Sequence, residues 1–594
     1  MIDLVRLVRF KRFVDHTFDV SGQYVLLAGP NNSGKTTLLH ALSAWYLALT
    51  RWLAERGRTG GKKRISIVLD EFTALPLREM NLLWLNRHTA IRTPSQKQPK
   101  PAPIYIQVVR KLGAKVSESL TMELMYANEK LLYVRPVKSP DDPTPIEVLP
   151  DSLLDLQVVL VPAFSGIGTQ EPKHSSGMQS KLVGEGKPGE IVRNLLLEIW
   201  ENSSKSKDNP PWKSLQADLS RLFQCDLIPP EFSATKPYII SEYRPKVQAN
   251  DPRTKAPRLD VANAGSGFHQ VLLLLAFFYA KTAAVLLLDE PDAHLHFLLQ
   301  REIFDHLRSL AMSRGSQLIV GTHAEVLLDD AEPQRIISFV SNAPSRLATE
   351  GDRMRLQDAM QTLTALDFVT ADQVRAVLYT EDESDYKILR EWAERLDHPA
   401  KTFLDFPYRV PLRGRGNLNE ARRHFSCLRM VHPQIRGLCI LDRNDQPLVS
   451  DTEAASGLRL MQWKRYEIEN YLLNPASLKR FVRGETSQST VDEQIIDNEF
   501  KRNFPPTIDF LSDLPAIRDL KASDFLVDIL SGTSRAIPKK DLFMIAKVME
   551  PSEIHTDVRN VLDAIASIIP ENPPALAANV VPEDPQGVDD VDAV

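Results

Sequence analysis

The fold of this chain is decided near its N-terminus by the stretch Leu26-Leu27-Ala28-Gly29-Pro30-Asn31-Asn32-Ser33-Gly34-Lys35-Thr36-Thr37. It has the form G-x-x-x-x-G-K-T, the phosphate-binding P-loop. An apolar run from Tyr24 to Ala28 precedes it and a helical pattern from Thr37 to Leu42 follows it, as a strand–loop–helix unit requires. In such a loop, backbone N–H groups surround the phosphates at the N-terminus of a helix. The stretch therefore predicts an α/β domain that binds ATP.

The P-loop assigns a role to each of its side chains. Lys35 is predicted to contact the β- and γ-phosphates, and the Thr36 hydroxyl is predicted to bind Mg²⁺. The other predicted nucleotide-binding residues of the loop are Gly29, Asn31, Asn32, Ser33, Gly34 and Thr37. A glycine-rich turn with a chance lysine is the alternative, and the flanking strand and helix patterns disfavour it.

Composition limits the class of protein. The chain has 594 residues, enough for roughly three or four domains, and a net charge of -5 that gives no global basic bias toward nucleic acid. Cys225, Cys427 and Cys439 lack metal-ligand spacing and are expected to be buried thiols in a reducing compartment. There is no signal-peptide pattern, and the longest apolar run (Val271 to Tyr279) is too short to span a bilayer. We expect a cytoplasmic protein without a membrane partner.

The second half of the predicted ATP site follows an apolar strand. The run Val285 to Leu288 ends in Asp289 and Glu290, which is the Walker B arrangement. A buried parallel strand would deliver Asp289 to Mg²⁺ and leave Glu290 to polarise the attacking water. Another apolar strand, Gln317 to Thr322, ends in His323, and a helix through Leu310 separates the two strands. These elements predict a βαβ unit of the P-loop domain.

Taken together, these motifs resemble the ABC-type ATPase heads of the SMC/RecF/OLD group. The stretch from Leu287 to His296 resembles the Walker B and D-loop of that group, and His323 resembles its switch histidine, which senses the γ-phosphate. The stretch from Ala264 to Gln270 lies where the group carries its signature, although a glycine stands in place of the signature serine and Ser266 follows it. The resemblance implies that Ser266 and Gly267 contact a nucleotide held by a second head, and hence a homodimer or higher homo-oligomer. A helix N-cap is the alternative for this stretch.

A second α/β pattern begins after residue 370. An apolar strand from Val374 to Tyr379 is followed by Glu381 and then by an amphipathic helix, and an apolar strand from Ile435 to Leu441 is followed by Asp442. Carboxylates at the C-terminal ends of two neighbouring parallel strands converge in space. Like charges there are costly without a cation, and oxygen ligands suit Mg²⁺. The pattern predicts a metal site able to act on a phosphodiester.

This pair of clusters resembles a Toprim domain, which the OLD-family nucleases join to an ABC-type head in this order. In the resemblance Glu381 takes the place of the Toprim glutamate, and Asp442 takes the first place of its D-x-D motif. Asn444 stands where the second aspartate is expected, and an amide is a weaker metal ligand than a carboxylate. The predicted metal ligands of this domain are Glu381, Asp385, Asp442, Asn444, Asp445, Glu467 and Glu469. Strand-end caps and a solvated acidic rim are the alternative reading of these residues.

Two later segments extend the resemblance. The stretch from Lys464 to Leu473 resembles the E-x-E-N-Y-L-L-like segment of Toprim-like effectors, and it is expected to be an extended strand with Glu467 and Glu469 on one face. The stretch from Ile537 to Leu542 resembles a P-G-K segment, in which Lys540 is the candidate for stabilising the phosphorane. The basic stretch from Tyr408 to His424 is suited to phosphate contacts, with a solvated helix surface as the alternative.

The fold class predicted is α/β: an ABC-type P-loop ATPase head with β-rich and helical insertions, followed by a Toprim-like α/β domain and a helical C-terminal part. The predicted domain boundaries are 1–345 for the head (insertions at about 51–260), 346–370 for a connector, 371–475 for the Toprim-like domain, 476–570 for the helical part and 571–594 for a disordered acidic tail.

The function predicted is an ATPase whose nucleotide state controls a Mg²⁺- or Mn²⁺-dependent nuclease, with Glu290, His323, Glu381, Asp442 and Lys540 as its catalytic residues. The resemblance implies a role in bacterial defence against phage, a DNA or tRNA-like RNA substrate, and a phage-encoded trigger or partner protein. The alternative is an ATPase sensor or scaffold with a degenerate Toprim domain. A repair ATPase of the RecF kind fits poorly, because that family does not imply the carboxylate clusters.

Overall fold

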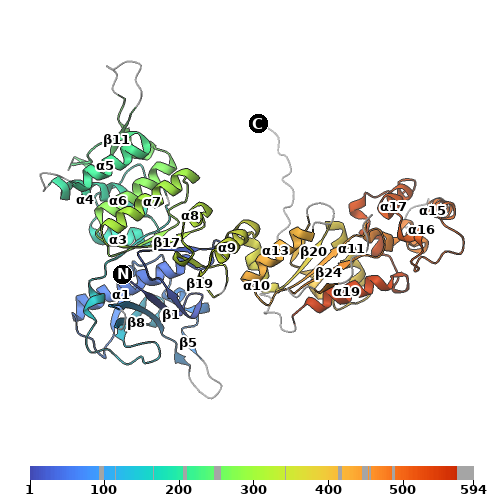
Figure 1. The fold of residues 1–594 in the computed structure, drawn as a ribbon, viewed down its shortest axis with the longest axis horizontal. Helices are drawn as coiled ribbons and strands as arrows, with labels where there is room; N and C mark the ends of the chain where they lie inside the picture. The colour runs from blue at the N-terminus through green and yellow to red at the C-terminus, as the bar shows by residue number, and fades with distance from the viewer. Residues whose placement is uncertain are drawn as a thin grey trace. The chain divides into compact units, whose positions relative to one another are not determined.

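The computed structural model describes residues 1–91, 99–113, 116–164, 166–204, 210–233, 235–246, 256–341, 343–412, 418–444, 452–453, 457–483 and 489–570. The chain divides into two compact units, Met1–Gln357 and Asp358–Val594, and each is described by itself (Figure 1). The division falls within helix α9 (Glu350–Thr362), inside the predicted connector. Among the described residues no helix is long and apolar enough to cross a membrane.

The P-loop strand lies inside a six-stranded sheet of the first unit. The strand order is β10-β16-β17-β3-β18-β19, and every neighbouring pair is parallel except β18 and β19. Because parallel strands end at one edge of a sheet, the register places Ala28 beside Thr322 and Asp289 beside Gly321. The strands are β3 (Tyr24–Ala28), β10 (Val158–Val161), β16 (Val285–Asp289), β17 (Gln317–Thr322), β18 (Ile336–Ser338) and β19 (Ser345–Arg346).

A second six-stranded sheet of the first unit is antiparallel and has the order β2-β1-β7-β8-β9-β4. The N-terminal hairpin therefore pairs with strands from the predicted β-rich region and not with the P-loop strand. Its strands are β1 (Leu4–Phe10), β2 (Phe13–Asp19), β4 (Ile65–Val68), β7 (Ile104–Lys111), β8 (Ser117–Asn128) and β9 (Leu131–Val137).

Helix α1 (Lys35–Arg56) packs against strands of both sheets, so one continuous core runs through this part of the unit. Trp45 and Trp52 are fully buried along the helix, and the indole Nε1 of Trp45 donates a hydrogen bond to the carbonyl of Leu120, 3.1 Å away. A helix that is apolar on nearly every side is expected only when it is enclosed. The P-loop helix is thus fixed in place over its whole length.

Most of the remaining helices of the first unit gather beside the parallel sheet (Figure 1), while α2 (Asp151–Leu154) contacts strand β8 of the antiparallel sheet. The other helices are α3 (Ser176–Gly184), α4 (Val192–Ser204), α5 (Pro210–Phe223), α6 (Ser266–Ala280), α7 (Phe297–Ser313) and α8 (Glu325–Asp329). Short strands accompany them: β11 (Cys225–Leu227), β12 (Glu231–Ser233), β13 (Lys236–Ile240), β14 (Glu242–Pro245) and β15 (Leu259–Asp260). Helix α6 is buried along nearly its whole length, which explains its continuous apolar sequence.

The second unit is built on a five-stranded sheet in the order β21-β20-β22-β24-β23, parallel except for β23. Its strands are β20 (Ala376–Thr380), β21 (Arg409–Pro411), β22 (Arg436–Leu441), β23 (Thr452–Glu453) and β24 (Leu458–Gln462). Helices α10 (Ala365–Val374), α11 (Glu383–Arg395), α12 (Lys401–Asp405) and α13 (Leu418–Val431) accompany it. Since β20 and β22 are parallel neighbours, Glu381 and Asp442 follow the same edge.

Helices fill the rest of the second unit, and they share one hydrophobic core with the sheet. They are α14 (Pro475–Val482), α15 (Ser489–Asn503), α16 (Pro515–Arg518), α17 (Ala522–Ser531), α18 (Phe543–Ala546) and α19 (Thr556–Ile568).

Two local expectations were wrong. Val374 ends helix α10 and does not begin the following strand, and residues 467–469 are not an extended strand. A short 3-10 helix, η7 (Ile468–Leu472), starts after Glu467, whose carboxylate caps it. This capping competes with the strand propensity of the surrounding apolar residues. The predicted tail 571–594 lies outside the described residues.

Candidate functional site

The P-loop connects β3 to α1 and has the close backbone packing that a phosphate cradle needs. Gly34 has a φ of 108°, and a Cβ there would lie 2.9 Å from Arg12 Cδ. Only glycine adopts that backbone conformation at no steric cost. A Cβ on Gly29 would lie 3.0 Å from the Cβ of Phe339, so this position also excludes a side chain. The two glycines of the motif are therefore required by the fold of the loop itself.

The lysine and the hydroxyl groups of the loop suit a nucleotide phosphate. Lys35 is buried, and its Nζ donates hydrogen bonds to the carbonyls of Gly29 and Pro30 at 2.7 and 2.8 Å. Burial lowers the pKa of Lys35 from its ordinary value. Ser33 Oγ is buried and has no hydrogen-bond partner among the described residues. An orphaned buried hydroxyl beside a buried ammonium fits a loop that receives an anion.

The Walker A and Walker B residues meet directly. The Thr36 hydroxyl donates a hydrogen bond to Asp289 Oδ1 at 3.0 Å, although 253 positions separate the two residues in sequence. Burial raises the pKa of Asp289 to about 6, and the hydrogen bond from Thr36 opposes the shift. A buried carboxylate next to a hydroxyl is the oxygen pair that Mg²⁺ uses in P-loop proteins. Thr36 and Asp289 would hold the cation.

Glu290 and His323 lie at the same edge of the sheet. The backbone N–H of Glu290 donates to the carbonyl of Gly321 at 2.9 Å, and Glu290 has a φ of 48°, which is unusual for a non-glycine residue. His323 Nδ1 lies 3.8 Å from Glu290 Oε1 and 3.9 Å from Asp292 Oδ2. The half-exposed imidazole and the Glu290 carboxylate therefore border the phosphate loop together.

The signature-like stretch, Ala264 to Gln270, lies at the start of helix α6. This position agrees with both interpretations of the stretch, an ABC-type signature and a helix N-cap. Gly265 is the N-cap, and Ser266 in the first turn is exposed. Gly267 lies against the segment after the Walker B strand: a Cβ there would be 3.6 Å from the carbonyl oxygen of His294. Gln270 donates from Nε2 to the carbonyl of Pro291 at 3.1 Å. The start of α6 is thus attached to the loop that carries Asp292.

One residue of the ATP site was missed in the sequence. Arg12, at the turn of the β1–β2 hairpin, donates from Nη1 to the carbonyl of Asn32 at 2.8 Å. Its alkyl chain covers Gly34. The hairpin pattern gives no hint of this contact, because the two segments meet only through the packing of the two sheets.

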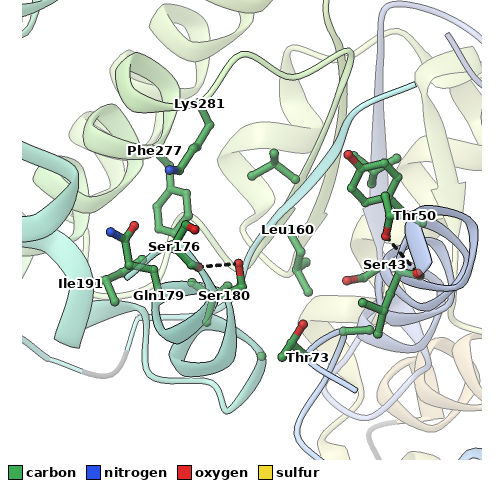
Figure 2. A pocket seen from close by; sticks show the side chains of 17 residues that line it. Ser43, Thr50, Thr73, Leu160, Ser176, Gln179, Ser180, Ile191, Phe277 and Lys281 are labelled. Atoms are coloured by element: carbon green, nitrogen blue, oxygen red, sulfur yellow. Dashed lines mark hydrogen bonds between the residues drawn. The ribbon is translucent and has the colours of Figure 1, made fainter. Parts of the chain in front are cut away.

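A separate cavity of about 400 Å³ lies beside the C-terminal half of α1 (Figure 2). Ser43 and Thr50 of α1 stand on one side of it, and Ser176, Gln179 and Ser180 of α3 stand on the other. None of its lining residues belongs to the P-loop or follows the Walker B strand. The cavity is therefore distinct from the phosphate-binding loop.

In the second unit, five carboxylates gather at the ends of β20 and β22. The backbone N–H of Asp442 donates to Glu381 Oε1 at 3.0 Å, and Asp442 Oδ1 accepts from the N–H of Ile468 at 3.1 Å. The other three carboxylates are those of Asp385, Glu467 and Glu469, all buried. The three segments that were predicted to converge are thus neighbours in the fold.

Burial and mutual repulsion disturb the protonation of this carboxylate cluster (Glu381, Asp385, Asp442, Glu467 and Glu469). Burial, with a further contribution from Glu469, raises the pKa of Asp385 to about 8. Burial also raises the pKa of Glu469 to about 7 and moves that of Asp442 well above its usual range. Glu469 Oε1 is buried without a hydrogen-bond partner among the described residues. Such a donor set fits a hard divalent cation chemically.

The geometry of the cluster also serves local structure. Asp385 Oδ2 accepts from the N–H of Asp382 at 3.0 Å as part of the capping box of α11. Glu467 Oε1 accepts from the N–H of Ser523 at 2.5 Å. Among the described residues, the one group with three ligand atoms within 4.8 Å of one another is Asp513, His555 and Asp557, outside this cluster. The five carboxylates are therefore close together without forming an assembled three-ligand site.

That tighter group is already neutralised by basic side chains. Lys464 Nζ lies 2.5 Å from Asp557 Oδ1, and Arg465 Nε lies 3.5 Å from Asp513 Oδ1. The hydroxyl of Tyr471 donates to Asp557 Oδ2 at 3.2 Å. These contacts identify an ion-pair network that fixes the 464–471 segment.

A lysine next to the predicted Lys540 lies near the carboxylate cluster. Lys539 Nζ lies 3.6 Å from Glu469 Oε1 and 3.8 Å from Glu467 Oε2, and both Lys539 and Lys540 are exposed. Both residues lie in the 3-10 helix η8 (Lys539–Asp541), where adjacent side chains point in different directions. The structure thus places Lys539 beside these carboxylates, and the role of Lys540 stays a prediction.

Asn444 occupies a turn that suits its residue type. It has a φ of 46°, and its N–H donates to the carbonyl of Tyr466 at 2.7 Å. Asn is among the few non-glycine residues that tolerate this conformation. Asp445 and residues 413–417 of the predicted basic stretch lie outside the described residues.

Comparison with known proteins finds one matching family model. Residues 214–329 match the family described as "AAA domain, putative AbiEii toxin, Type IV TA system". The matched range includes the start of α6, the Walker B strand and His323. No curated protein matches the chain.

Similar solved structures include three SMC heads. The SmcHead bound to the C-winged helix domain of ScpA has 15% identity and a TM-score of 0.32, over 57% of this chain and 93% of that one. The SMC head domain from Thermotoga maritima has 14% identity and a TM-score of 0.30, over 59% and 99%. The Smc head domain with an extended coiled coil bound to the C-terminal domain of ScpA, from Pyrococcus furiosus, has 14% identity and a TM-score of 0.32, over 61% and 99%. The assignment of an AAA-type ATPase domain rests on the family model and on the geometry of the site.

Proposed function

We propose that this chain hydrolyses ATP and that its nucleotide state controls a metal-dependent nuclease formed by the carboxylate cluster of the second unit. The observation that carries the ATPase is the hydrogen bond between Thr36 and Asp289, which joins the two halves of a P-loop site. Glu290 orients the attacking water, His323 contacts the γ-phosphate, and Lys35 neutralises charge that develops on it. Thr36 and Asp289 would hold Mg²⁺, which would offset the negative charge of the phosphates.

Head-to-head pairing of two copies completes the proposed ATP site. Ser266 and Gly267 begin α6 at an exposed helix N-terminus, which favours a phosphate brought by a second copy. The side chains of Phe297 and Leu298, close after the Walker B strand, are 56% and 65% exposed. Apolar residues that are exposed on a monomer are typical of a surface that is covered on association.

The nuclease proposal is supported by the gathering of five carboxylates at the ends of β20 and β22, where burial raises the pKa values of Asp385, Asp442 and Glu469. Divalent ions, when bound there, would activate water and stabilise the leaving oxygen of a phosphodiester. Glu381 and Asp442 would hold the cation, and Lys539 would steady the charge of the phosphate. The substrate proposed is DNA or a tRNA-like RNA, and the biological role is defence against phage with a phage-encoded trigger.

A second candidate function is an ATPase sensor or scaffold whose Toprim-like part binds a partner protein. Two observations favour this function. Asp385 and Glu467 belong to capping boxes at the starts of helices, and Asn444 has a positive φ that explains the choice of asparagine without a metal. A scaffold retains ATP turnover and has no cleavage chemistry.

Cleavage assays with matched variants separate the two functions. Plasmid, single-stranded DNA and bulk tRNA are incubated with Mg²⁺ or Mn²⁺, with and without ATP. Lys35→Ala removes the P-loop ammonium, and Glu381→Gln removes one carboxylate of the cluster. Glu383→Gln is the control for Glu381→Gln, because Glu383 is an exposed carboxylate two residues further on, at the start of α11, and is paired with Lys387.

We expect Lys35→Ala to abolish ATP turnover and Glu381→Gln to reduce cleavage by at least about 100-fold with turnover intact, since removal of one charge-stabilising group typically costs this much. Glu383→Gln should behave as the wild type. Lys539→Met should impair cleavage while Lys540→Met does not. Intact ATP turnover with no cleavage of any substrate would leave the scaffold as the function.

A further inference from the structure

Arg193 is fully buried in the first turn of α4, with 0% of its surface exposed. Its Nη1 donates to the carbonyl of Gly168 at 2.7 Å, and its Nη2 donates to Asp260 Oδ1 at 2.7 Å. Removing a guanidinium from water is costly unless its hydrogen bonds and its charge are matched. The buried guanidinium of Arg193 therefore depends on both of its acceptors, the carbonyl of Gly168 and the carboxylate of Asp260.

Glu171 completes this buried cluster. Its carboxylate accepts from the N–H of Arg193 at 2.9 Å, and from the N–H and Nδ2 of Asn194 at 2.6 Å each. The carboxylate thus holds the first turn of α4, and the turn carries the guanidinium. The Arg193 cluster is defined as Gly168, Glu171, Arg193 and Asp260, and each of the other three residues accepts a hydrogen bond from Arg193.

One end of the cluster belongs to the segment that leaves the parallel sheet. Gly168 follows strand β10, whose last residue Val161 is in register with Leu288, the residue before Asp289. The same segment contains Phe164, whose ring centroid lies 6.0 Å from that of His269 in the first turns of α6. The segment therefore connects the Walker B edge of the sheet with the start of α6.

The other end of the cluster begins the turn that leads into α6. Asp260 Oδ1 accepts from Arg193 and also from the N–H of Ala262 at 2.8 Å, which caps the short 3-10 helix η5 (Val261–Asn263). Ser266 lies three positions after Asn263, the last residue of η5, and the imidazole Nε2 of His269 lies 2.7 Å from the carbonyl of Val261. Residues 260–269 are thus one folded unit that is attached to Arg193.

We propose that Arg193 is a positioning residue that fixes the turn bearing Ser266 and Gly267 relative to the Walker B edge, and so sets how this turn meets ATP held by a second copy of the chain. The proposal deepens the proposed ATPase function and rests on it. Arg193 contacts neither nucleotide nor reacting atoms. Its effect comes through alignment, and a displacement of about 1 Å at a reacting centre costs about 100-fold in rate.

Lysine cannot replace this arginine. The two acceptors, Gly168 and Asp260, are reached by two different nitrogens of one planar group. A lysine has a single ammonium and no fixed fork, so one of the two acceptors would lose its partner. Arg193→Lys should therefore resemble Arg193→Met in rate although it preserves the charge.

The test compares full-length variants by ATP affinity, steady-state turnover and thermal unfolding. Arg135→Met is the matched control, since Arg135 also makes a mostly buried ion pair, with Glu123 at 2.9 Å, in the antiparallel sheet of the same unit. Asp260→Ser retains a capping oxygen for Ala262 and is too short to reach Arg193, whereas Asp260→Asn retains both contacts. Binding of a fluorescent ATP analogue measures the ATP affinity of the P-loop site within one copy of the chain. The value of kcat measures hydrolysis at the site that a second copy completes.

We expect Arg193→Met, Arg193→Lys and Asp260→Ser to lower kcat at least tenfold with ATP affinity and KM within twofold of wild type. Asp260→Asn and Arg135→Met should retain kcat within about threefold. If Arg193→Met does not fold, Asp260→Ser decides, because Asp260 is 37% exposed and its replacement leaves the core intact. Equal kcat for Asp260→Ser, Arg135→Met and wild type would overturn the positioning role. A wild-type protein without ATP turnover would overturn the proposed function instead.

Discussion

Burial raises the pKa values of several acidic residues at the candidate sites of this protein. Asp289 at the ATP site, and Asp385 and Glu469 in the second unit, all have raised pKa values with burial as the largest cause. Desolvation penalises a charge wherever no cation offsets it. The functions proposed for these carboxylates each involve a bound cation. Such a cation would favour the ionised form of the carboxylate.

A raised pKa also predicts how stability depends on pH. Burial raises the pKa of Glu171 to about 7, and its hydrogen bonds to Arg193 and Asn194 limit the shift. The folded state therefore binds a proton that the unfolded state releases between about pH 4.5 and pH 7, so this residue's contribution to stability is lost as pH rises through that window. A shift of this size corresponds to a contribution on the order of 3 kcal/mol.

Glu171→Gln removes this titration. We expect the wild type to be the more stable protein at pH 5 and to lose its advantage by pH 7.5, as measured by thermal unfolding of the two proteins at each pH. The glutamine still offers one oxygen to Asn194, so the fold is expected to survive. A constant difference between the two unfolding midpoints across this range would show that Glu171 is ionised throughout.

At the level of elements, the start of a helix decides where several functional groups lie. Asp385 belongs to the capping box of α11, Glu467 caps η7, and Gly265 precedes the first turn of α6. A helix N-terminus leaves N–H groups that need acceptors, so acidic and small residues collect there. The same N–H groups attract phosphate, which is why a structural cap and a binding site are hard to tell apart in a sequence.

The central strand of the second unit depends on one glycine. A Cβ on Gly437 of β22 would lie 2.6 Å from Phe425 Cε2 and 2.9 Å from Leu458 Cδ1, and Phe425 is buried on α13. Gly437→Ala should therefore force the ring of Phe425 to shift and destabilise the second unit by about 1–3 kcal/mol. Chemical denaturation measures this loss.

Gly532→Ala is the control for that substitution. Gly532 ends α17 with a φ of -82°, and a Cβ there would be 3.5 Å from the carbonyl of Ile529. Because this distance is an ordinary van der Waals contact, we expect Gly532→Ala to change the free energy of unfolding by no more than about 0.5 kcal/mol. Equal losses from the two substitutions would mean that the packing of α13 on β22 is looser than described.

The whole molecule combines two units with separate hydrophobic cores. A ligand stabilises only the unit that binds it, by about 2.7 kcal/mol at a concentration 100 times its Kd. At about 2–4 °C per kcal/mol for a unit of about 150–250 residues, this corresponds to a shift of about 5–11 °C. We expect ATP to raise one thermal transition and Mg²⁺ without nucleotide to raise another. Differential scanning calorimetry measures both.

Single variants assign each transition. Lys35→Ala should remove the shift caused by ATP and leave the shift caused by Mg²⁺, while Glu381→Gln should do the reverse. A shift by Mg²⁺ that survives Glu381→Gln would place the cation outside the carboxylate cluster and favour the scaffold function.

Much of the ATP site could be predicted from sequence, because its motifs are local. Lys35 and Thr36 are adjacent at the start of α1, directly after the loop, and Asp289 ends its own strand, so strand patterns and spacing suffice to bring them to one sheet edge. The convergence of Glu381 and Asp442 could be predicted for the same reason, since their strands are parallel neighbours. The positions of these residues follow from the order of strands and helices along the chain. Their catalytic roles stay predictions.

What the sequence alone determined is therefore the chemistry carried by contiguous motifs: the phosphate loop, the Walker B strand and the acidic strand ends. Only the tertiary structure decided which of two adjacent lysines meets the carboxylates, that Glu467 caps a 3-10 helix, and that Arg12 and Arg193 contact segments distant in sequence. The physical reason is the distance along the chain over which each kind of interaction acts. Backbone propensity and hydrophobic period act over a few residues, whereas these contacts depend on how sheets and helices pack against one another.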